Sequence, residues 1–189
     1  MSNFYASPAD HVAVRPGLSD DLRKLLVAIP KEKWQDHPNY WRGADFWQGV
    51  HRAILSQSGA FAGGLQELSE LSGDALERGL LLNELRQLGR QLLGHAHVHH
   101  HVEDDHYFPR LKRAYPRLAR PIDLLDGDHR ALEENLAAVD EHLRVLSTET
   151  ADRDTIGRAL DDARALDRLL NRHIADEEDI VIPVLLQDR

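Results

Sequence analysis

Two short segments of the sequence combine histidine and glutamate at a spacing that suits metal binding. In the first, His99 is followed four residues later by Glu103 and, after six more, by Pro109. Residues i and i+4 lie one turn apart on the same face of a helix, so this pair can direct an imidazole and a carboxylate at one point. The same spacing returns near the C-terminus in His173, Glu177 and Pro183.

A further histidine precedes each of these pairs. His51 begins the segment His-Arg-Ala-Ile, and His129 begins the similar segment His-Arg-Ala-Leu. The order of one histidine followed by a His-x-x-x-Glu pair therefore occurs twice, which chance does not readily produce. The candidate metal ligands are His51, His99, Glu103, His129, His173 and Glu177.

The composition limits the kind of metal site. The chain has twelve histidines and no cysteine, which excludes disulfides, thiolate zinc sites and a cysteine nucleophile. Any metal must be bound through nitrogen and oxygen, a donor set that suits iron, manganese or zinc.

Charge and hydropathy exclude several classes of partner. The formal net charge is −9 and no block of lysine and arginine stands out, which disfavours nucleic acid and anionic membranes. The sequence has no apolar run of the roughly 20 residues that a membrane span needs, and its start lacks a signal-peptide pattern. We expect a cytoplasmic protein without a membrane segment; the sequence names no protein partner.

Apolar residues recur at alternating spacings of three and four, which predicts long amphipathic helices. The predicted helices cover residues 44–71, 75–112, 122–147 and about 154–186. The alternation of a β-strand is absent, so we predict an all-α fold. Four long helices joined by short turns pack as an up-down-up-down four-helix bundle.

We expect two parts in the chain. Residues 1–43 form an N-terminal arm with a short helix near residues 19–29, packed on the bundle formed by residues 44–189. The aromatic segment 31–47 would cover one end of the bundle and shape a channel for a small molecule. His37 within it is interpreted as a surface residue.

Antiparallel packing explains how the candidate ligands can meet. His51 and His129 lie near the starts of their helices, and each His-x-x-x-Glu pair lies late in the helix that follows. The start of one helix lies beside the end of the next, so all six side chains converge if the two halves share one level. Four imidazoles and two carboxylates suit two ions, with the glutamates as bridges, and favour iron or manganese over a closed tetrahedral zinc site.

At these residues the sequence resembles the hemerythrin-like, or HHE cation-binding, family. The resemblance rests on the two His-Arg-Ala-[Ile/Leu] segments and the two His-x-x-x-Glu motifs with their prolines, and it covers about residues 44–187. It implies a four-helix bundle around two iron ions (Fe²⁺/Fe³⁺) with an oxo or hydroxo bridge, manganese or zinc being less favoured. It also implies that the four histidines are terminal ligands and that Glu103 and Glu177 are bridging ligands.

One departure from the oxygen carriers of that family leaves the function open. The carriers combine one His-x-x-x-Glu with a His-x-x-x-His and a later His-x-x-x-x-Asp, whereas this chain repeats His-x-x-x-Glu. A di-iron protein that binds dioxygen, peroxide or nitric oxide, with oxidoreductase activity as an option, is the first hypothesis. The alternatives are a non-catalytic iron or oxygen sensor or store whose fold depends on metal, and a structural zinc bundle.

For most of the remaining histidines and acidic residues we do not predict direct metal binding. His95 and His106 are interpreted as outer hydrogen-bonding or core residues, with direct ligation as the alternative. His97, His100 and His101 are assigned to another face of the helix, either solvated or interhelical. A solvated face is also expected for four acidic residues beside the motifs, one of which would accept a ligand's N–H: Asp104, Asp105, Glu178 and Asp179.

Overall fold

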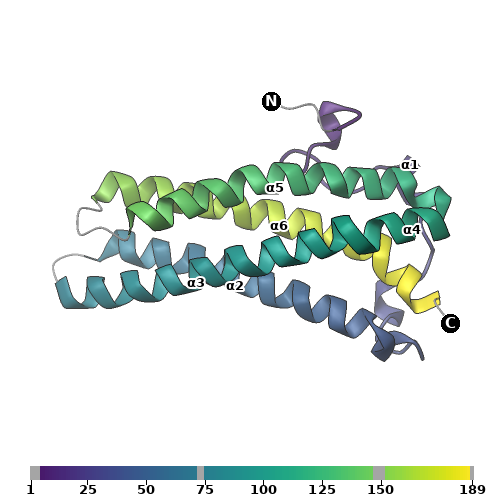
Figure 1. Ribbon diagram of the computed structural model, residues 1–189, viewed down its shortest axis with the longest axis horizontal. Coiled ribbons are helices and arrows are strands. Elements are labelled where there is room, and N and C mark those ends of the chain that lie inside the picture. The colour runs from purple at the N-terminus through teal and green to yellow at the C-terminus, as the bar shows by residue number, and fades with distance from the viewer. Residues whose placement is uncertain (1–4, 72–74, 147–151, 188–189) are drawn as a thin grey trace. The chain divides into compact units, whose positions relative to one another are not determined.

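The computed structural model describes residues 5–71, 75–146 and 152–187. Its main elements are four long helices, preceded by short helical turns and packed as an all-α bundle (Figure 1). This confirms the predicted fold class. The long helices are α2 (Ala44–Glu70), α3 (Ala75–Val102), α5 (Ala119–Val145) and α6 (Arg153–Gln187).

Shorter elements connect these helices. The short helix α1 (Asp20–Arg23) begins where the side chain of Ser19 accepts a hydrogen bond from the backbone N–H of Leu22, and it is shorter than the segment 19–29 in which a helix was predicted. Helix α4 (Phe108–Ala114) leads from α3 toward α5. The remaining turns are η1 (Pro8–Asp10), η2 (Lys31–Lys33), η3 (Tyr40–Arg42) and η5 (Pro116–Leu118).

The predicted second helix is interrupted at the motif. Between α3 and α4 lies a π-helical segment, η4 (Glu103–Tyr107), in which the N–H of Phe108 donates to the carbonyl of Glu103, five residues back. Pro109 follows this segment and has no N–H for an α-helical ladder. The equivalent Pro183 lies inside the continuous helix α6, so the proline alone does not explain the widened turn. Single π turns of this kind recur at functional sites.

The chain forms two compact units. We call residues 1–52, 99–131 and 171–189 the histidine-rich unit, and residues 53–98 and 132–170 the apolar unit. The histidine-rich unit contains the start of α2, the end of α3, the start of α5 and the end of α6. All six candidate ligands therefore belong to one unit. The predicted boundary between residues 43 and 44 stays a prediction.

The N-terminal segment is part of the core of the histidine-rich unit. Trp34 and Tyr40 are buried in an apolar cluster with Phe108 and Ile182, whereas Trp41 is 76% exposed. Two aromatic side chains of this segment thus belong to the core of the unit, and a channel for a small molecule at this end stays a prediction.

The apolar unit has a conventional hydrophobic interior. Its helices pack so closely that a Cβ atom at Gly89 would lie 2.7 Å from Leu143 and 3.0 Å from Phe61. No helix in the described ranges combines the length and apolar composition that crossing a bilayer requires. Among the largest fully buried side chains of this unit are Phe61, Ile54, Leu65, Leu68, Leu92, Leu132, Leu136 and Leu146.

Candidate metal centre

The structure brings all six predicted ligands together in the interior of the histidine-rich unit. The four most enclosed are His173 and Glu177, with no exposed surface, and His51 and Glu103, each 1% exposed. Even the least enclosed, His99, keeps only 9% of its side chain accessible. Such polar groups are rarely buried without partners.

A first group joins α2, α3 and α6. The Nε2 atoms of His51 and His99 lie 3.1 Å apart. His51 Nε2 lies 3.2 Å from Glu177 Oε2, and His99 Nε2 lies 3.1 Å from Glu103 Oε1. Four potential ligands therefore surround one point.

A second group joins α5 and α6. The Nε2 atoms of His129 and His173 lie 3.2 Å apart. Glu103 Oε2 lies 3.3 Å from His129 Nε2, and Glu177 Oε2 lies 3.6 Å from His173 Nε2. Glu103 thus presents one carboxylate oxygen to each group, which is the arrangement of a bridging ligand.

The donor atoms fit a pair of cations. Both carboxylate oxygens of Glu103 and Oε2 of Glu177 are buried without a hydrogen-bond partner among the described residues. In each group two imidazole nitrogens face each other at about the 3 Å that separates nitrogens bound at right angles to one ion with bonds of about 2.1 Å. Without a cation these lone pairs would repel, so protons or metal ions must lie between them.

The pKa values describe the metal-free centre. Burial, and then the neighbouring Glu177, raise the pKa of Glu103 well above its ordinary value. Burial also acts to raise the pKa of Glu177, but His51 and His99 lower it well below the ordinary range. One carboxyl group is thus neutral and the other ionised, as expected for two acids in one buried site.

Two of the histidines carry the compensating protons. Burial disfavours the charged form of His51, but Glu177 and Glu178 raise its pKa to about 10. Burial likewise opposes the charge on His129, whose pKa Asp104 and Glu103 raise to about 10. Metal ions that bind here must displace these protons.

Carboxylates fix the outer nitrogens of three histidines. His51 Nδ1 lies 3.1 Å from Glu178 Oε1, and His129 Nδ1 lies 2.7 Å from Asp104 Oδ1. Each of these acids directly follows the glutamate of a motif and supports the single histidine of the other half. Two such acids, where the sequence interpretation expected one, therefore lie within hydrogen-bonding distance of a candidate ligand, and the doubled Glu-[Asp/Glu] pattern is the signal for both.

His173 is oriented by Asp128, a residue that the sequence did not single out. Its Nδ1 lies 3.1 Å from Asp128 Oδ2. Arg15 of the N-terminal arm donates through Nη1 to Asp128 Oδ1 at 2.7 Å and through Nε to Asp176 Oδ2 at 2.8 Å. Tyr5 donates its hydroxyl to Asp128 at 2.9 Å. Burial acts to raise the pKa of Asp128, but Arg15 and His173 lower it, so the group stays ionised.

Trp47 is a further supporting residue. Its indole N–H donates to Glu177 Oε1 at 2.6 Å, which fixes the carboxylate whose other oxygen faces the histidines. Hydrogen bonds to ligands of this kind commonly change metal affinity by about 10- to 100-fold.

His100 occupies the interhelical one of the two positions that the sequence interpretation left open. It is 6% exposed, and its Nε2 has no hydrogen-bond partner among the described residues. Its ring stacks on that of His129, with centroids 4.2 Å apart and an interplanar angle of 19°. His100, His129 and His173 form a group whose potential ligand atoms lie within 4.8 Å of one another.

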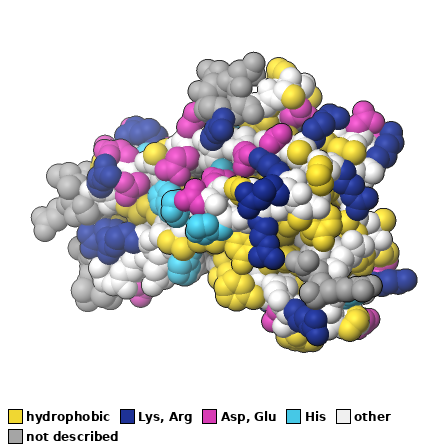
Figure 2. Space-filling model, turned by 45° about the vertical axis from the view of Figure 1, so that its right-hand side comes forward, with side chains coloured by type: hydrophobic (Ala, Val, Ile, Leu, Met, Phe, Trp, Pro, Cys, Tyr) yellow, Lys and Arg dark blue, Asp and Glu magenta, His cyan; other side chains and the backbone are white. Residues whose placement is uncertain are grey.

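The other additional histidines lie at the surface. His95 is exposed, with its Nδ1 2.9 Å from Gln57 Oε1, and His106 is exposed as well. The interpretation of these two histidines as core residues or hydrogen-bond partners of ligands was therefore wrong, because Ala96 and His100 occupy the buried face of the helix instead. Neither belongs to a ligand group in the described chain. His97 and His101 are exposed as predicted, each near a carboxylate, at 3.1 and 3.3 Å. Figure 2 shows surface histidines beside acidic side chains.

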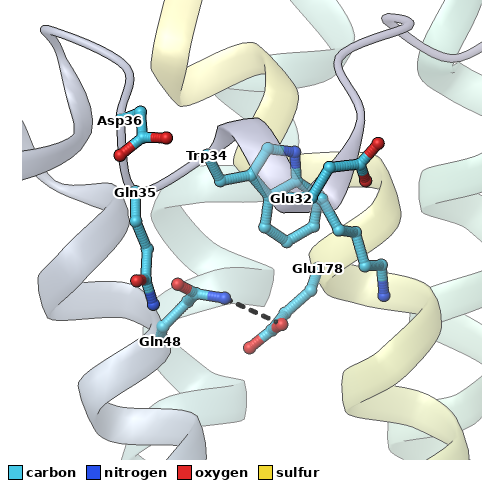
Figure 3. A pocket seen from close by; sticks show the side chains of 7 residues that line it. Glu32, Trp34, Gln35, Asp36, Gln48 and Glu178 are labelled. Carbon is cyan, nitrogen blue, oxygen red and sulfur yellow. Dashed lines mark hydrogen bonds between the residues drawn. The ribbon is translucent and has the colours of Figure 1, made fainter.

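A polar pocket lies outside the first group. It has a volume of about 390 Å³ and is lined mainly by the segment that starts at Lys31, together with Gln48 and Glu178 (Figure 3). Gln48 Nε2 donates to Glu178 Oε2 at 3.1 Å, and the other oxygen of this carboxylate faces His51. One carboxylate therefore connects the pocket to a candidate ligand.

Comparison with protein families shows which family the chain belongs to. The model described as Hemerythrin HHE cation binding domain matches residues 42–185. The chain belongs to the hemerythrin HHE family. Comparisons with curated proteins and with solved structures gave no significant match. The match begins after the arm that carries Arg15, so the hemerythrin HHE domain here has a supporting contact from outside its own boundaries.

Proposed function

We propose that this hemerythrin HHE protein is a non-haem di-iron protein that binds dioxygen or a related small oxidant such as peroxide or nitric oxide. The observation that supports this most is the position of Glu103, whose two buried oxygens face two different pairs of histidines. Two groups that share a carboxylate suit two ions better than one.

The proposed ligands fall into three pairs. His51 and His99 bind one ion, and His129 and His173 bind the other. Glu103 and Glu177 bridge the ions and offset part of their mutual repulsion. The absence of cysteine and the mixture of imidazole and carboxylate favour iron, with manganese next.

When bound, an iron pair supplies one-electron redox changes beside a position for a small ligand. The protein's own contribution is to hold the ligands. Asp104 and Glu178 orient two imidazoles, and Trp47 orients Glu177. Because the centre is enclosed, it suits a diatomic or peroxide ligand rather than a large organic substrate. Oxidoreductase activity toward peroxide is compatible with this arrangement.

The test is reconstitution with ferrous iron, followed by iron analysis and assays of azide binding and peroxide consumption. We expect about two irons per chain and a shift of the near-ultraviolet absorption when azide is added. Glu103→Gln should have neither the two-iron content nor the azide shift. His37→Ala is the matched control, because His37 lies outside both ligand groups, and it should retain two irons. One zinc per chain with a featureless spectrum would contradict the proposal.

A second candidate, a non-catalytic iron or oxygen sensor or store, is favoured by one contact. Arg15 ties the N-terminal arm to Asp128, which in turn orients His173. Metal occupancy would thereby be linked to docking of the arm. Limited proteolysis decides: a sensor's arm is cleaved faster after iron removal, and equal cleavage rates with and without iron count against this candidate.

A further inference from the structure

The two halves of the repeat differ at the residues that directly precede the single histidine and the motif glutamate. These residues are aspartates in the second half and valines in the first: Asp128 and Asp176 against Val50 and Val102. Neither aspartate has any exposed surface. Two buried carboxylates need compensation that two valines do not. The helices of the first half form without them, so the aspartates are not a requirement of the helix packing.

Arg15 from the N-terminal arm supplies the compensation. Its side chain is 3% exposed. Nη1 donates to one oxygen of Asp128 at 2.7 Å, Nη2 donates to the other, and Nε donates to Asp176 at 2.8 Å. Such a two-pronged contact fixes the plane and direction of a carboxylate, which a single ammonium group does not. Among the described residues, Arg15 is the one lysine or arginine that contacts Asp128.

Asp128 in turn constrains a candidate ligand. Its Oδ2 lies 3.1 Å from Nδ1 of His173, whose Nε2 lies 3.2 Å from His129 and 3.6 Å from Glu177. An ionised carboxylate only accepts hydrogen bonds, so it keeps the proton of the ring on Nδ1. The lone pair of Nε2 then faces the second group of donors, and the ring cannot rotate away from it.

The arm is fastened so that Arg15 stays in this position. Nη1 of Arg15 also donates to the backbone carbonyl of Asp10 at 2.7 Å, which ties the guanidinium to the arm itself. Arg172 of α6 donates to the backbone carbonyl of Pro16 at 2.7 Å and through Nε to Asp176 at 3.0 Å. The residue next to Arg15 is thereby attached to the helix that carries His173.

We propose that Arg15 is a positioning residue of the metal centre and acts through Asp128 on His173. The metal site of this chain then includes a side chain from outside the matched residues 42–185. This inference rests on the two-ion centre proposed above.

The test is a double-mutant cycle of Arg15→Ala and Asp128→Asn in the full-length protein. Each metal-free variant is titrated with Co²⁺ and followed by visible absorption, and circular dichroism measures its helix content. Arg42→Ala is the matched control, since Arg42 is an exposed arginine of the N-terminal segment. Arg15→Ala is also titrated with guanidinium chloride present at a non-denaturing concentration, and with sodium chloride at the same concentration.

The expected results link Arg15 to metal binding through Asp128. Wild type and Arg42→Ala take two Co²⁺ with equal affinities. In Arg15→Ala one of the two Co²⁺ binds about 10- to 100-fold more weakly, the effect of losing the support of a ligand. The double variant binds no more weakly than Asp128→Asn alone, because both changes remove the same support. Guanidinium, but not sodium, restores the affinity of Arg15→Ala and leaves Asp128→Asn unchanged.

Other results would overturn the inference. A wild-type Co²⁺ isotherm in Arg15→Ala would show that Arg15 only attaches the arm. Additive losses in the double variant, or a loss that guanidinium does not reverse, would show that Arg15 supports the fold rather than His173. If Arg15→Ala loses helix content, Arg15→Gln is titrated instead, and an unchanged isotherm there has the same meaning. A wild-type protein that does not take two Co²⁺ would instead contradict the proposed two-ion function itself.

Discussion

The histidine-rich unit and the apolar unit are built from the same long helices but have different interiors. Among the buried polar and charged residues of the described chain, only Ser58 belongs to the apolar unit. Leucine, isoleucine and phenylalanine fill the rest of that interior. In the histidine-rich unit the helices instead bury imidazoles and carboxylates next to an apolar cluster.

The difference shows where metal contributes to the fold. Aliphatic side chains stabilise the apolar unit by burial alone. Buried histidines and glutamates cost free energy unless a cation or a hydrogen bond compensates them. The histidine-rich unit should therefore depend on its ions, and the apolar unit should not.

Metal removal should produce the largest difference between the two units. At a thousandfold excess over its Kd, each ion stabilises the folded state by about 4 kcal/mol. Chelation should accelerate amide hydrogen exchange in residues 99–131 and 171–187 far more than in residues 81–98 and 132–146. Equal acceleration in all four ranges would remove the distinction between the units.

A cavity in the apolar unit should lower the stability of the fold without lowering the metal content. Leu136 has no exposed surface, so Leu136→Ala should lower the free energy of unfolding by about 2–5 kcal/mol. Denaturant titration measures this loss, and the metal content of the folded protein should stay at two ions per chain. If Leu136→Ala loses metal under conditions in which it remains folded, the two units are more strongly coupled than we infer.

Loss of one supporting hydrogen bond should reduce metal affinity without abolishing it. Trp47→Phe removes the N–H that donates to Glu177, a hydrogen bond to a charged group worth about 1.5–3 kcal/mol. Metal affinity should fall by about tenfold or more in a competition titration with a chelator. The control is Trp41→Phe, which changes a tryptophan that is 76% exposed, and it should bind metal as wild type does.

The pH dependence of metal binding should have a definite direction. The pKa values of His51 and His129 are about 10 in the metal-free protein, so both are protonated near neutral pH and must release their protons when ions bind. Metal affinity should therefore rise with pH until about 10, by about 1.4 kcal/mol per pH unit for each proton released. Calorimetry in buffers of different ionisation enthalpy counts the protons; no buffer dependence would contradict the assignment.

The sequence predicted the helices and the convergence of six side chains because both follow from regular spacing. His51 and His129 could be found because the His-Arg-Ala segment repeats. His100 could not be assigned in this way, since a single stripe per helix admits His99 and excludes its neighbour. Inside a bundle the buried surface of a helix is wider than one stripe, and both residues are enclosed.

Arg15 lay beyond sequence prediction for a different reason. The arm has no helical periodicity, and its contacts with Asp128 and Asp176 span 113 and 161 residues of chain. The π-helical segment at Glu103 was also missed, because hydrophobic periodicity does not distinguish it from an α-helix. Pro109 was no sufficient signal, since the equivalent Pro183 lies within the continuous helix α6.

The most direct test of the two-ion centre is the iron content of anaerobically reconstituted protein, measured beside Glu103→Gln. We predict about two irons per chain in wild type and at most one in the variant, because Glu103 faces both histidine pairs. Two irons in both proteins would contradict the bridging role of Glu103. One iron or less in wild type would contradict the di-iron centre.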